Sequence, residues 1–361
     1  MIREAFVVAE PGAADAPVAG VPYLLRTLLV LQRAGIERCT VVGAAVPSDR
    51  RLRVAATAAP ALTAPADDAL RLVIGPGAVV DERLVRDLDA RARPGRVTEV
   101  EAGGARVRVA PGTLVAANGG RAEAPRAGTL ARLDAPRRRL ETSLLRGLEN
   151  PRDGWLDSLL FRRLSRPLTR RLLPTGVSPN AVTFAGILIG IAGGLLLGAP
   201  HSALVAAGVA ALVGSGVLDC SDGELARLRF AESRLGHWLD ITGDTAVHAA
   251  VLGGIVLGLR ESNRVPGTPV LVALALGVVG AFAVVTWSEL TEGRRRRAGG
   301  WENRVLDGVL GPLSTRDWHV FVVVFALAGR LDGLVVGGAV GAHVFWLIGL
   351  VLVRRVLARG G

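Results

Sequence analysis

Residues 217–248 read VLDCSDGELARLRFAESRLGHWLDITGDTAVH and carry four aspartates between two long apolar segments. The four are Asp219, Asp222, Asp240 and Asp244. A charged side chain at bilayer depth costs about 2.5 to 3.5 kcal/mol on the insertion scale, so four unpaired carboxylates facing lipid would cost about 10 kcal/mol or more. We therefore expect the four carboxylates to face the protein interior and to be compensated there.

The first two aspartates share one face of a predicted helix. In a helix that runs from Asp219 to Arg227, Asp222 lies about 60° from Asp219 around the axis. The same face carries the small residues Gly223 and Ala226. This arrangement indicates that another group approaches the helix closely here.

A second stripe lies on the next predicted helix, where Gly236, Asp240 and Asp244 are each one turn apart. Arg227 can neutralise only one of the four carboxylates. Hard divalent cations such as Mg²⁺ or Ca²⁺ prefer oxygen ligands, and two cations balance four carboxylates better than one. A pair of such ions can bridge a diphosphate and orient an attacking hydroxyl, while a free carboxylate can act as a general base.

Six segments are apolar enough to be candidates for membrane spans, each of which needs about 20 apolar residues. Residues 172–218 contain no formally charged side chain and are interrupted at Gly198 and Pro200, which predicts two spans joined by a tight turn. The further predicted spans are residues 235–259, 265–288, 318–329 and 333–353. The fifth span is short and must borrow flanking residues.

Arginine is distributed unevenly between the two ends of these spans. With a cytoplasmic N-terminus, the outside turns hold only Arg260, Arg264 and Arg330. The inside segments hold Arg162, Arg163, Arg166, Arg170, Arg171, Arg227, Arg229, Arg234, Arg294 to Arg297, Arg354, Arg355 and Arg359. The positive-inside rule therefore predicts a multi-pass protein of the cell (inner) membrane, with the N-terminal domain and the C-terminus in the cytoplasm.

Composition excludes two classes of site. The 361 residues include 43 basic and 32 acidic ones, for a net charge of +11, and every Lys or Arg position is arginine. With one tyrosine in the chain and no aromatic residues within the arginine runs, a base-stacking surface is not expected, and we predict no nucleic-acid partner. Cys39 and Cys220 lie far apart, which argues against a disulfide framework and a cysteine zinc site.

Before residue 150 the pattern changes to short β-rich runs that alternate with helical ones. The predicted strands are residues 5–10, 39–44 and 70–75, and the predicted helices are residues 21–35 and 81–93. Residues 97–112 predict a hairpin that turns at Gly103 and Gly104. This alternation predicts a small α/β domain with a largely parallel sheet, followed by an all-α membrane domain.

The aspartate stretch resembles the signature D-x-x-D-G-x-x-A-R-x₈-G-x-x-x-D-x-x-x-D of the CDP-alcohol phosphotransferase family. All eight fixed positions match: Asp219, Asp222, Gly223, Ala226, Arg227, Gly236, Asp240 and Asp244. Members of this family displace CMP from a CDP-linked donor and pass the remaining phosphoalcohol to a second hydroxyl. The resemblance implies an integral-membrane enzyme of phospholipid-type biosynthesis, and a homodimer is expected.

The resemblance also implies residue roles. Asp219, Asp222, Asp240 and Asp244 would form the metal site for two Mg²⁺ ions, which Mn²⁺ or Ca²⁺ could replace. Asp244 would also deprotonate the acceptor. The CDP group would be held by Asn180, Gly223, Ala226, Arg227 and Gly236, with Arg227 on the diphosphate.

Residues upstream of the signature extend the resemblance. An amphipathic, arginine-rich helix over residues 153–174 would lie in the membrane interface, and SPNAVT (178–183) would enter the first span. We therefore expect domain bounds of 1–135 for the α/β domain, 136–152 for a linker and 153–361 for the membrane domain.

Residues 18–44 are similar to the first helix and second strand of a nucleotidyltransferase domain. Such a domain fused to a CDP-alcohol phosphotransferase is similar to the arrangement in inositol-phosphate cytidylyltransferase fusions. The loop AEPGAADAPVAG (9–20) lacks the cation needed to hold a triphosphate, and Pro76 stands where a metal-binding aspartate is expected. We expect an inactive relative kept for packing, regulation or dimer contacts and dispensable for the transfer chemistry. A bifunctional enzyme with an active N-terminal cytidylyltransferase is the alternative.

Arginines near the predicted site favour a phosphorylated polyol, such as inositol phosphate or glycerol phosphate, as the acceptor. The candidates for gripping that phosphate are Arg163, Arg166, Arg316 and the run Arg294 to Arg297. A planar guanidinium suits bidentate phosphate binding, although the same residues also fit a topology signal. The donor is either CDP-diacylglycerol or a soluble CDP-polyol.

Two functions from other classes fit some of these residues. A divalent-cation transporter would use the four aspartates for permeation, but they cluster at the cytoplasmic ends of spans and not at the midplane, where transporter sites usually lie. A non-catalytic membrane anchor would leave the eight-position signature unexplained.

Overall fold

The computed structural model describes residues 2–10, 12–115, 122–148, 160–310 and 318–359. The chain forms two compact units. Unit 1 comprises Met1–Glu149, Arg170–Gly176 and Glu224–Ala231, and unit 2 comprises Asn150–Thr169, Val177–Gly223 and Glu232–Gly361. The last six residues of helix α6 (Ser202–Arg229) therefore belong to unit 1.

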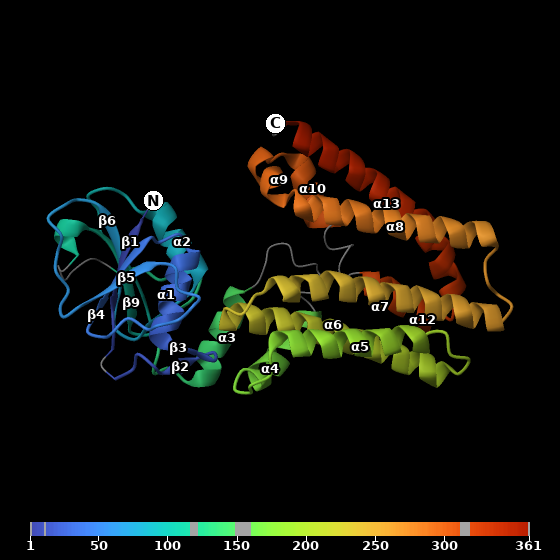
Figure 1. Cartoon of the computed structure of the whole chain (residues 1–361), viewed down its shortest axis with the longest axis horizontal. Coiled ribbons are helices and arrows are strands. Elements are labelled where there is room, and N and C mark those ends of the chain that lie inside the picture. The colour runs from blue at the N-terminus through green and yellow to red at the C-terminus, as the bar shows by residue number, and fades with distance from the viewer. Residues whose placement is uncertain (1, 11, 116–121, 149–159, 311–317, 360–361) are drawn as a thin grey trace. The chain divides into compact units, whose positions relative to one another are not determined.

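Unit 1 is built on a six-stranded sheet with the order β5-β4-β1-β6-β9-β8 (Figure 1). Its strands are β1 (Glu4–Val8), β4 (Arg38–Val42), β5 (Ala55–Ala59), β6 (Leu70–Ile74), β8 (Thr98–Ala102) and β9 (Ala105–Pro111). The first four in that order are parallel, and β9 and β8 are antiparallel to their neighbours. The predicted α/β fold with a largely parallel sheet is confirmed.

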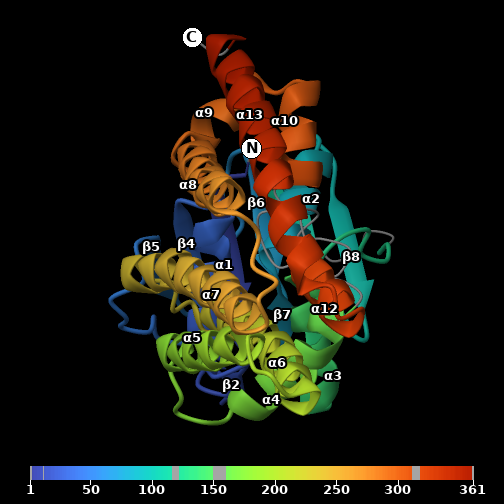
Figure 2. The ribbon, with the colours of Figure 1, turned by 90° about the vertical axis from the view of Figure 1, so that its right-hand side faces the viewer.

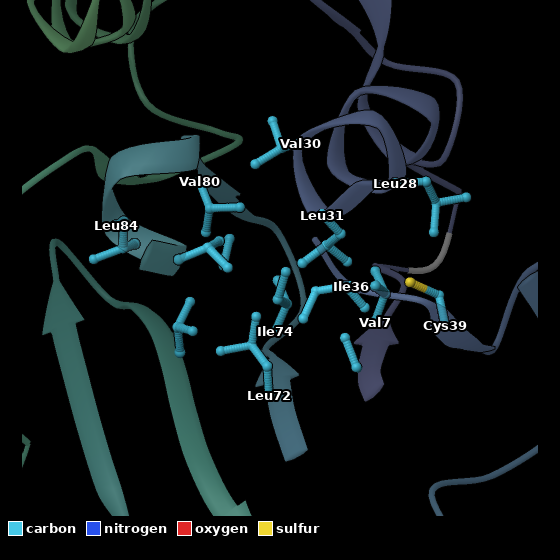
Figure 3. Packing of buried hydrophobic residues seen from close by; sticks show 14 of the residues in the cluster. Val7, Leu28, Val30, Leu31, Ile36, Cys39, Leu72, Ile74, Val80 and Leu84 are labelled. Atoms are coloured by element: carbon cyan, nitrogen blue, oxygen red, sulfur yellow. The ribbon is translucent and has the colours of Figure 1, made fainter. Parts of the chain in front are cut away.

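Two helices accompany the strands as expected from the alternating pattern. Helices α1 (Tyr23–Arg33) and α2 (Glu82–Arg91) coincide with the predicted ones. Figure 3 shows Leu28 and Leu31 of α1 in the same buried cluster as strand residues such as Val7 and Ile74. Apolar burial on this scale is the dominant favourable contribution to folding.

The predicted hairpin joins β8 and β9. Ala102 pairs with Ala105, and the two turn residues, Gly103 and Gly104, have φ angles of 56° and 81°. Positive φ at both positions is the requirement of a two-residue type I′ turn, which glycine meets without strain.

Several short elements were not evident from the sequence. They are β2 (Pro17–Val18), β3 (Val21–Pro22), β5, β7 (Ala78–Val80), β10 (Leu130–Arg132), a 3₁₀ turn at Gly112–Leu114 and α3 (Arg137–Gly147). Strand β5 reads AATAA, which carries no strand signal, and the segment predicted to be a linker, 136–152, contains α3 with Leu140, Leu144 and Leu145 buried.

Unit 2 is helical (Figures 1 and 2), and the helices apolar enough to cross a membrane lie mostly within it. The long helices are α5 (Pro179–Leu196), α6, α7 (Arg234–Glu261), α8 (Thr268–Leu290) and α13 (Leu331–Arg359). Shorter elements are α4 (Arg162–Leu172), α9 (Glu292–Ala298), α10 (Trp301–Val305), a π-helical turn at Leu306–Leu310 and α12 (Trp318–Leu327). Residues 153–159 of the predicted interfacial helix lie outside the described residues.

Five helices within the described residues are long and apolar enough to cross a membrane: α5, α6, α7, α8 and α13. The predicted fifth span coincides with α12, for which ten residues are described. All six predicted segments therefore fall on helices, and the predicted multi-pass helical domain is confirmed.

Glycines allow α5 and α7 to pack backbone against backbone. A Cβ built on Gly194 would lie 2.6 Å from the backbone nitrogen of Val251, and one on Gly254 would overlap the Gly194 carbonyl. Ser215 of α6 donates a 2.8 Å hydrogen bond to the Gly186 carbonyl of α5. Small residues at such spacing are the usual means of close helix association in membranes.

Gly254→Ala is expected to destabilise unit 2, because the added methyl group would meet the α5 backbone, which cannot move aside as a side chain could. Overpacking of this kind costs about 1 to 3 kcal/mol. The matched control is Gly253→Ala, since a Cβ there meets nothing within 4 Å. Thermal unfolding in detergent should show a lower midpoint for Gly254→Ala alone, and equal midpoints would contradict the close packing.

Candidate active site

Three of the predicted aspartates meet between α6 and α7. Among the described residues, carboxylate oxygens of Asp219, Asp240 and Asp244 all lie within 4.8 Å of one another. Asp219 is half-buried, and the other two are exposed. At an effective dielectric of 20, each pair of like charges at such a distance costs roughly 3 kcal/mol. A bound cation would remove this repulsion.

The chemistry of this donor set fits a hard divalent cation. Carboxylate oxygens are the preferred ligands of Mg²⁺ and Ca²⁺, and the three residues offer one oxygen each at mutually compatible distances. Asp222 is not part of this group, and its side chain is buried. The structure thus brings together three of the four aspartates that the sequence assigned to the metal.

Helix N-caps fix where the site residues point. The Ser233 hydroxyl accepts a 3.0 Å hydrogen bond from the Gly236 amide and begins α7, which sets the phase of Asp240 and Asp244 along that helix. In α5, the Ser178 hydroxyl accepts from the Ala181 amide at 3.2 Å. Both helices therefore begin at defined residues next to the site.

The first turns of α5 and α7 lie close together. A Cβ built on Gly236 would be 3.0 Å from the Asn180 side-chain oxygen. Two residues predicted to hold CDP are thereby neighbours in space, although they are far apart in the sequence. The other three predicted CDP residues, Gly223, Ala226 and Arg227, lie on α6 and are half-buried.

The predicted acceptor arginines are dispersed. On α4, Arg163 is exposed and Arg166 is half-buried, whereas Arg316 lies outside the described residues. Arg295 is buried, donates from Nε to the Ser288 carbonyl at 3.0 Å and pairs with Asp307 at 3.5 Å. Its guanidinium therefore binds the end of α8, a role that the sequence did not indicate.

One buried carboxylate in the signature was missed by sequence reasoning. Glu224 occupies a variable position of the pattern, yet its side chain is fully buried. Since a buried acid requires compensation, its place six residues from the end of α6 marks this end of the helix as structurally constrained. The only sequence signal was its position inside the signature.

Residues 176–352 match the family model described as CDP-alcohol phosphatidyltransferase. This chain carries a CDP-alcohol phosphatidyltransferase domain. Both clustered aspartate helices, α6 and α7, fall within the matched range. Within the CDP-alcohol phosphatidyltransferase domain, the Asp219, Asp240 and Asp244 group is the acidic cluster found among the described residues.

Known proteins similar to the CDP-alcohol phosphatidyltransferase domain include a phosphatidylinositol phosphate synthase from Mycobacterium marinum. The similarity is 36% identity over 118 residues, which is 32% of this chain and 50% of the relative. The matched segment thus spans half the length of that curated protein.

Two crystal structures of Mycobacterium tuberculosis phosphatidylinositol phosphate synthase are also similar. The apo form shows 20% identity and a TM-score of 0.36, covering 54% of this chain and 94% of that one. The form with CDP-DAG bound shows 22% identity and a TM-score of 0.33, covering 55% of this chain and 94% of that one.

Proposed function

We propose that the chain transfers a substituted phosphate group from a CDP-linked alcohol to an acceptor hydroxyl and releases CMP. The observation that carries this proposal is the cluster of three carboxylates at the signature positions of a CDP-alcohol phosphatidyltransferase domain. CDP-diacylglycerol is the proposed donor, because the domain consists largely of helices that can cross a membrane and a similar protein was crystallised with CDP-DAG.

The reaction exchanges one phosphorus–oxygen bond for another. The acceptor oxygen attacks the phosphorus that bears the donor alcohol, the bond from that phosphorus to the CMP oxygen breaks, and CMP leaves. Asp244 accepts the proton of the attacking hydroxyl. Asp219, Asp222 and Asp240 would hold the divalent cations with Asp244, and bound cations would neutralise charge on the diphosphate.

The chain's own residues orient the donor in this proposal. Arg227 would bind the diphosphate, and Gly223, Ala226 and Gly236 would leave room for the nucleotide. Asn180 would bind beside Gly236, which its side chain approaches. A polyol phosphate such as inositol phosphate is the proposed acceptor, with Arg163, Arg166 and Arg316 as candidate phosphate ligands.

We propose an inactive nucleotidyltransferase-like domain at residues 1–135, a linker at 136–152 and the membrane domain at 153–361. In the loop after β1, the Glu10 carboxylate lies against Gly77 and pairs with Arg132 at 3.6 Å. An acid at this place would repel a triphosphate. We further propose that the protein is a homodimer in the inner membrane, with its N-terminal domain and C-terminus in the cytoplasm. The membrane location and the orientation rest on the arginine distribution.

The experiment that tests the function is CMP release from the purified full-length chain with Mg²⁺. The donors are CDP-diacylglycerol and a soluble CDP-polyol, and the acceptors are inositol phosphate, glycerol phosphate and serine. We expect release with CDP-diacylglycerol and a polyol phosphate, and no pyrophosphate release when CTP replaces the donor.

Sealed liposomes separate this enzyme from a cation transporter. The transferase needs no cation flux, so Mg²⁺ or Mn²⁺ uptake by the full-length chain should equal that of empty liposomes. Uptake without nucleotide, together with no CMP release from any pair of substrates, would overturn the assignment. Pyrophosphate release from CTP would instead favour a bifunctional enzyme.

A further inference from the structure

Helix α6 ends in a conformation that its sequence does not favour. Phe230 has a φ of 54°, and the Ala231 amide donates to the Ala226 carbonyl at 2.8 Å while the Phe230 amide donates to Arg227 at 3.4 Å. This pattern is a Schellman terminator, in which the left-handed position is usually glycine. A phenylalanine held there is strained, so something else must hold it in place.

The ring of Phe230 is fixed by two cations of unit 1. It is buried in the unit 1 core cluster, with the Arg26 guanidinium 5.3 Å and the Arg33 guanidinium 4.4 Å from the ring centroid. Burial lowers the pKa of Arg26 to about 10, with the Asp81 carboxylate opposing the shift, so the guanidinium is charged at neutral pH. Both distances are within the range of cation–π attraction.

The backbone of the same turn is held as well. Arg26 Nη1 donates to the Leu228 carbonyl at 2.8 Å, and Arg51 Nη1 donates to the Arg229 carbonyl at 2.8 Å. The last carbonyls of a helix lack partners within the helix, and cations stabilise them. Two 2.8 Å hydrogen bonds from Arg51 to the Asp49 carboxylate fix its guanidinium. We call Arg26, Arg33 and Arg51 the α6 clamp.

The turn that the α6 clamp holds carries two signature residues. Ala226 and Arg227 supply the carbonyls that accept the terminator hydrogen bonds, and Arg227 is the arginine assigned to the donor diphosphate. A guanidinium binds a phosphate through two parallel hydrogen bonds, which require a defined position and direction of the side chain. Fixing the backbone from which Arg227 extends therefore favours binding of the diphosphate. The left-handed turn at Phe230 sets the position of the Arg227 backbone.

We propose that Phe230 and the α6 clamp are positioning residues for donor binding, acting through Arg227. The proposal rests on the proposed function. It gives unit 1 a part in the transfer. The sequence alone predicts, in contrast, that the α/β domain is dispensable for that chemistry. Loss of the clamp should therefore raise the KM for the CDP-linked donor while leaving kcat and the Mg²⁺ requirement nearly unchanged.

The test compares two terminators of the same kind in the full-length chain. Asn263, with a φ of 51°, follows α7 in an equivalent turn, where the Arg264 amide donates to the Leu259 carbonyl at 2.8 Å. Both Phe230→Gly and Asn263→Gly remove left-handed strain, but only Phe230→Gly removes a clamped ring. We expect a rise in donor KM of about ten-fold for Phe230→Gly, with kcat within about three-fold, and no change for Asn263→Gly.

A conservative variant of Phe230 and a variant of the α6 clamp outside the core cluster guard against misfolding. Phe230→Tyr keeps the aromatic ring and should retain the wild-type KM for the donor. Arg51 is half-buried, and Arg51→Ala should raise the donor KM about three-fold, whereas the control Arg53→Ala, at an exposed position two residues away, should not. Amide hydrogen exchange over residues 226–231 should be faster in Phe230→Gly and Arg51→Ala than in the wild type.

The outcomes separate this proposal from the proposed function. An absence of CMP release from the wild type would refute the proposed function, and with it donor positioning, even if exchange over residues 226–231 still revealed the clamp. With an active wild type, an unchanged KM in both Phe230→Gly and Arg51→Ala would overturn positioning alone. A fall in kcat that merely follows the folded fraction would also overturn it.

Discussion

Asp240→Asn is expected to abolish CMP release and, without divalent cations, to raise the midpoint of thermal unfolding. The two effects have one cause. Carboxylate oxygens of Asp219, Asp240 and Asp244 lie within 4.8 Å of one another, so replacing one carboxylate relieves repulsion of roughly 3 kcal/mol for each pair when all three are ionised. The same change replaces a charged carboxylate ligand by a neutral amide oxygen, which weakens the binding of a divalent cation. Asp219→Asn should behave alike.

Thermal unfolding with and without Mg²⁺ measures this prediction independently of activity. The wild type should be stabilised by Mg²⁺, because a ligand that binds only the folded state raises its stability, and the two variants should respond far less. Glu261→Gln is the matched control, since it removes an exposed carboxylate from the other end of α7. Full activity in Asp219→Asn or Asp240→Asn would refute the proposed metal site.

Asp244→Asn is expected to slow CMP release by about 10² to 10⁴-fold, the usual cost of losing a general base. Asparagine keeps the shape of the side chain and an oxygen that can bind a cation, but it cannot accept the proton of the acceptor hydroxyl. Binding of the CDP-linked donor with Mg²⁺ should therefore be retained. Equilibrium binding of the donor and single-turnover CMP release measure the two effects separately.

The pattern across the variants distinguishes a base from a ligand. Asp240→Asn should lose both Mg²⁺-dependent stabilisation and turnover, whereas Asp244→Asn should lose mainly turnover. If Asp244→Asn releases CMP at the wild-type rate, another group takes the proton. If it loses donor binding to the same degree as turnover, Asp244 acts as a binding residue.

The proposed α6 clamp gives unit 1 a role that does not require nucleotide chemistry of its own. Its core includes Phe230, and its arginines hold the carbonyls of Leu228 and Arg229. Such a domain is useful to the proposed transfer if it fixes Arg227, even with Glu10 beside Gly77 in the loop after β1. Under the proposed function, this role accounts for an α/β domain beside a membrane transferase, and it requires no triphosphate site in that domain.

The sequence by itself determined the features that depend on local pattern. Uncharged segments of sufficient length predicted the membrane helices, and alternating β-rich and helical runs predicted the sheet with α1 and α2. The spacing of Asp240 and Asp244 placed them one above the other on α7 before any tertiary contact was known, because helical geometry fixes the direction of side chains four residues apart.

Only the tertiary structure decided which of these residues meet. The packing of α5, α6 and α7 through glycines brings Asp219 to Asp240 and Asp244 but leaves Asp222 outside their group. Contacts of this kind depend on the crossing of whole helices, which no short pattern encodes. The α6 clamp joins Arg26 and Arg51 to a turn about 200 residues away in the chain. A phenylalanine in a left-handed turn gives no sequence signal, because its strain is offset by contacts that exist only in the folded chain.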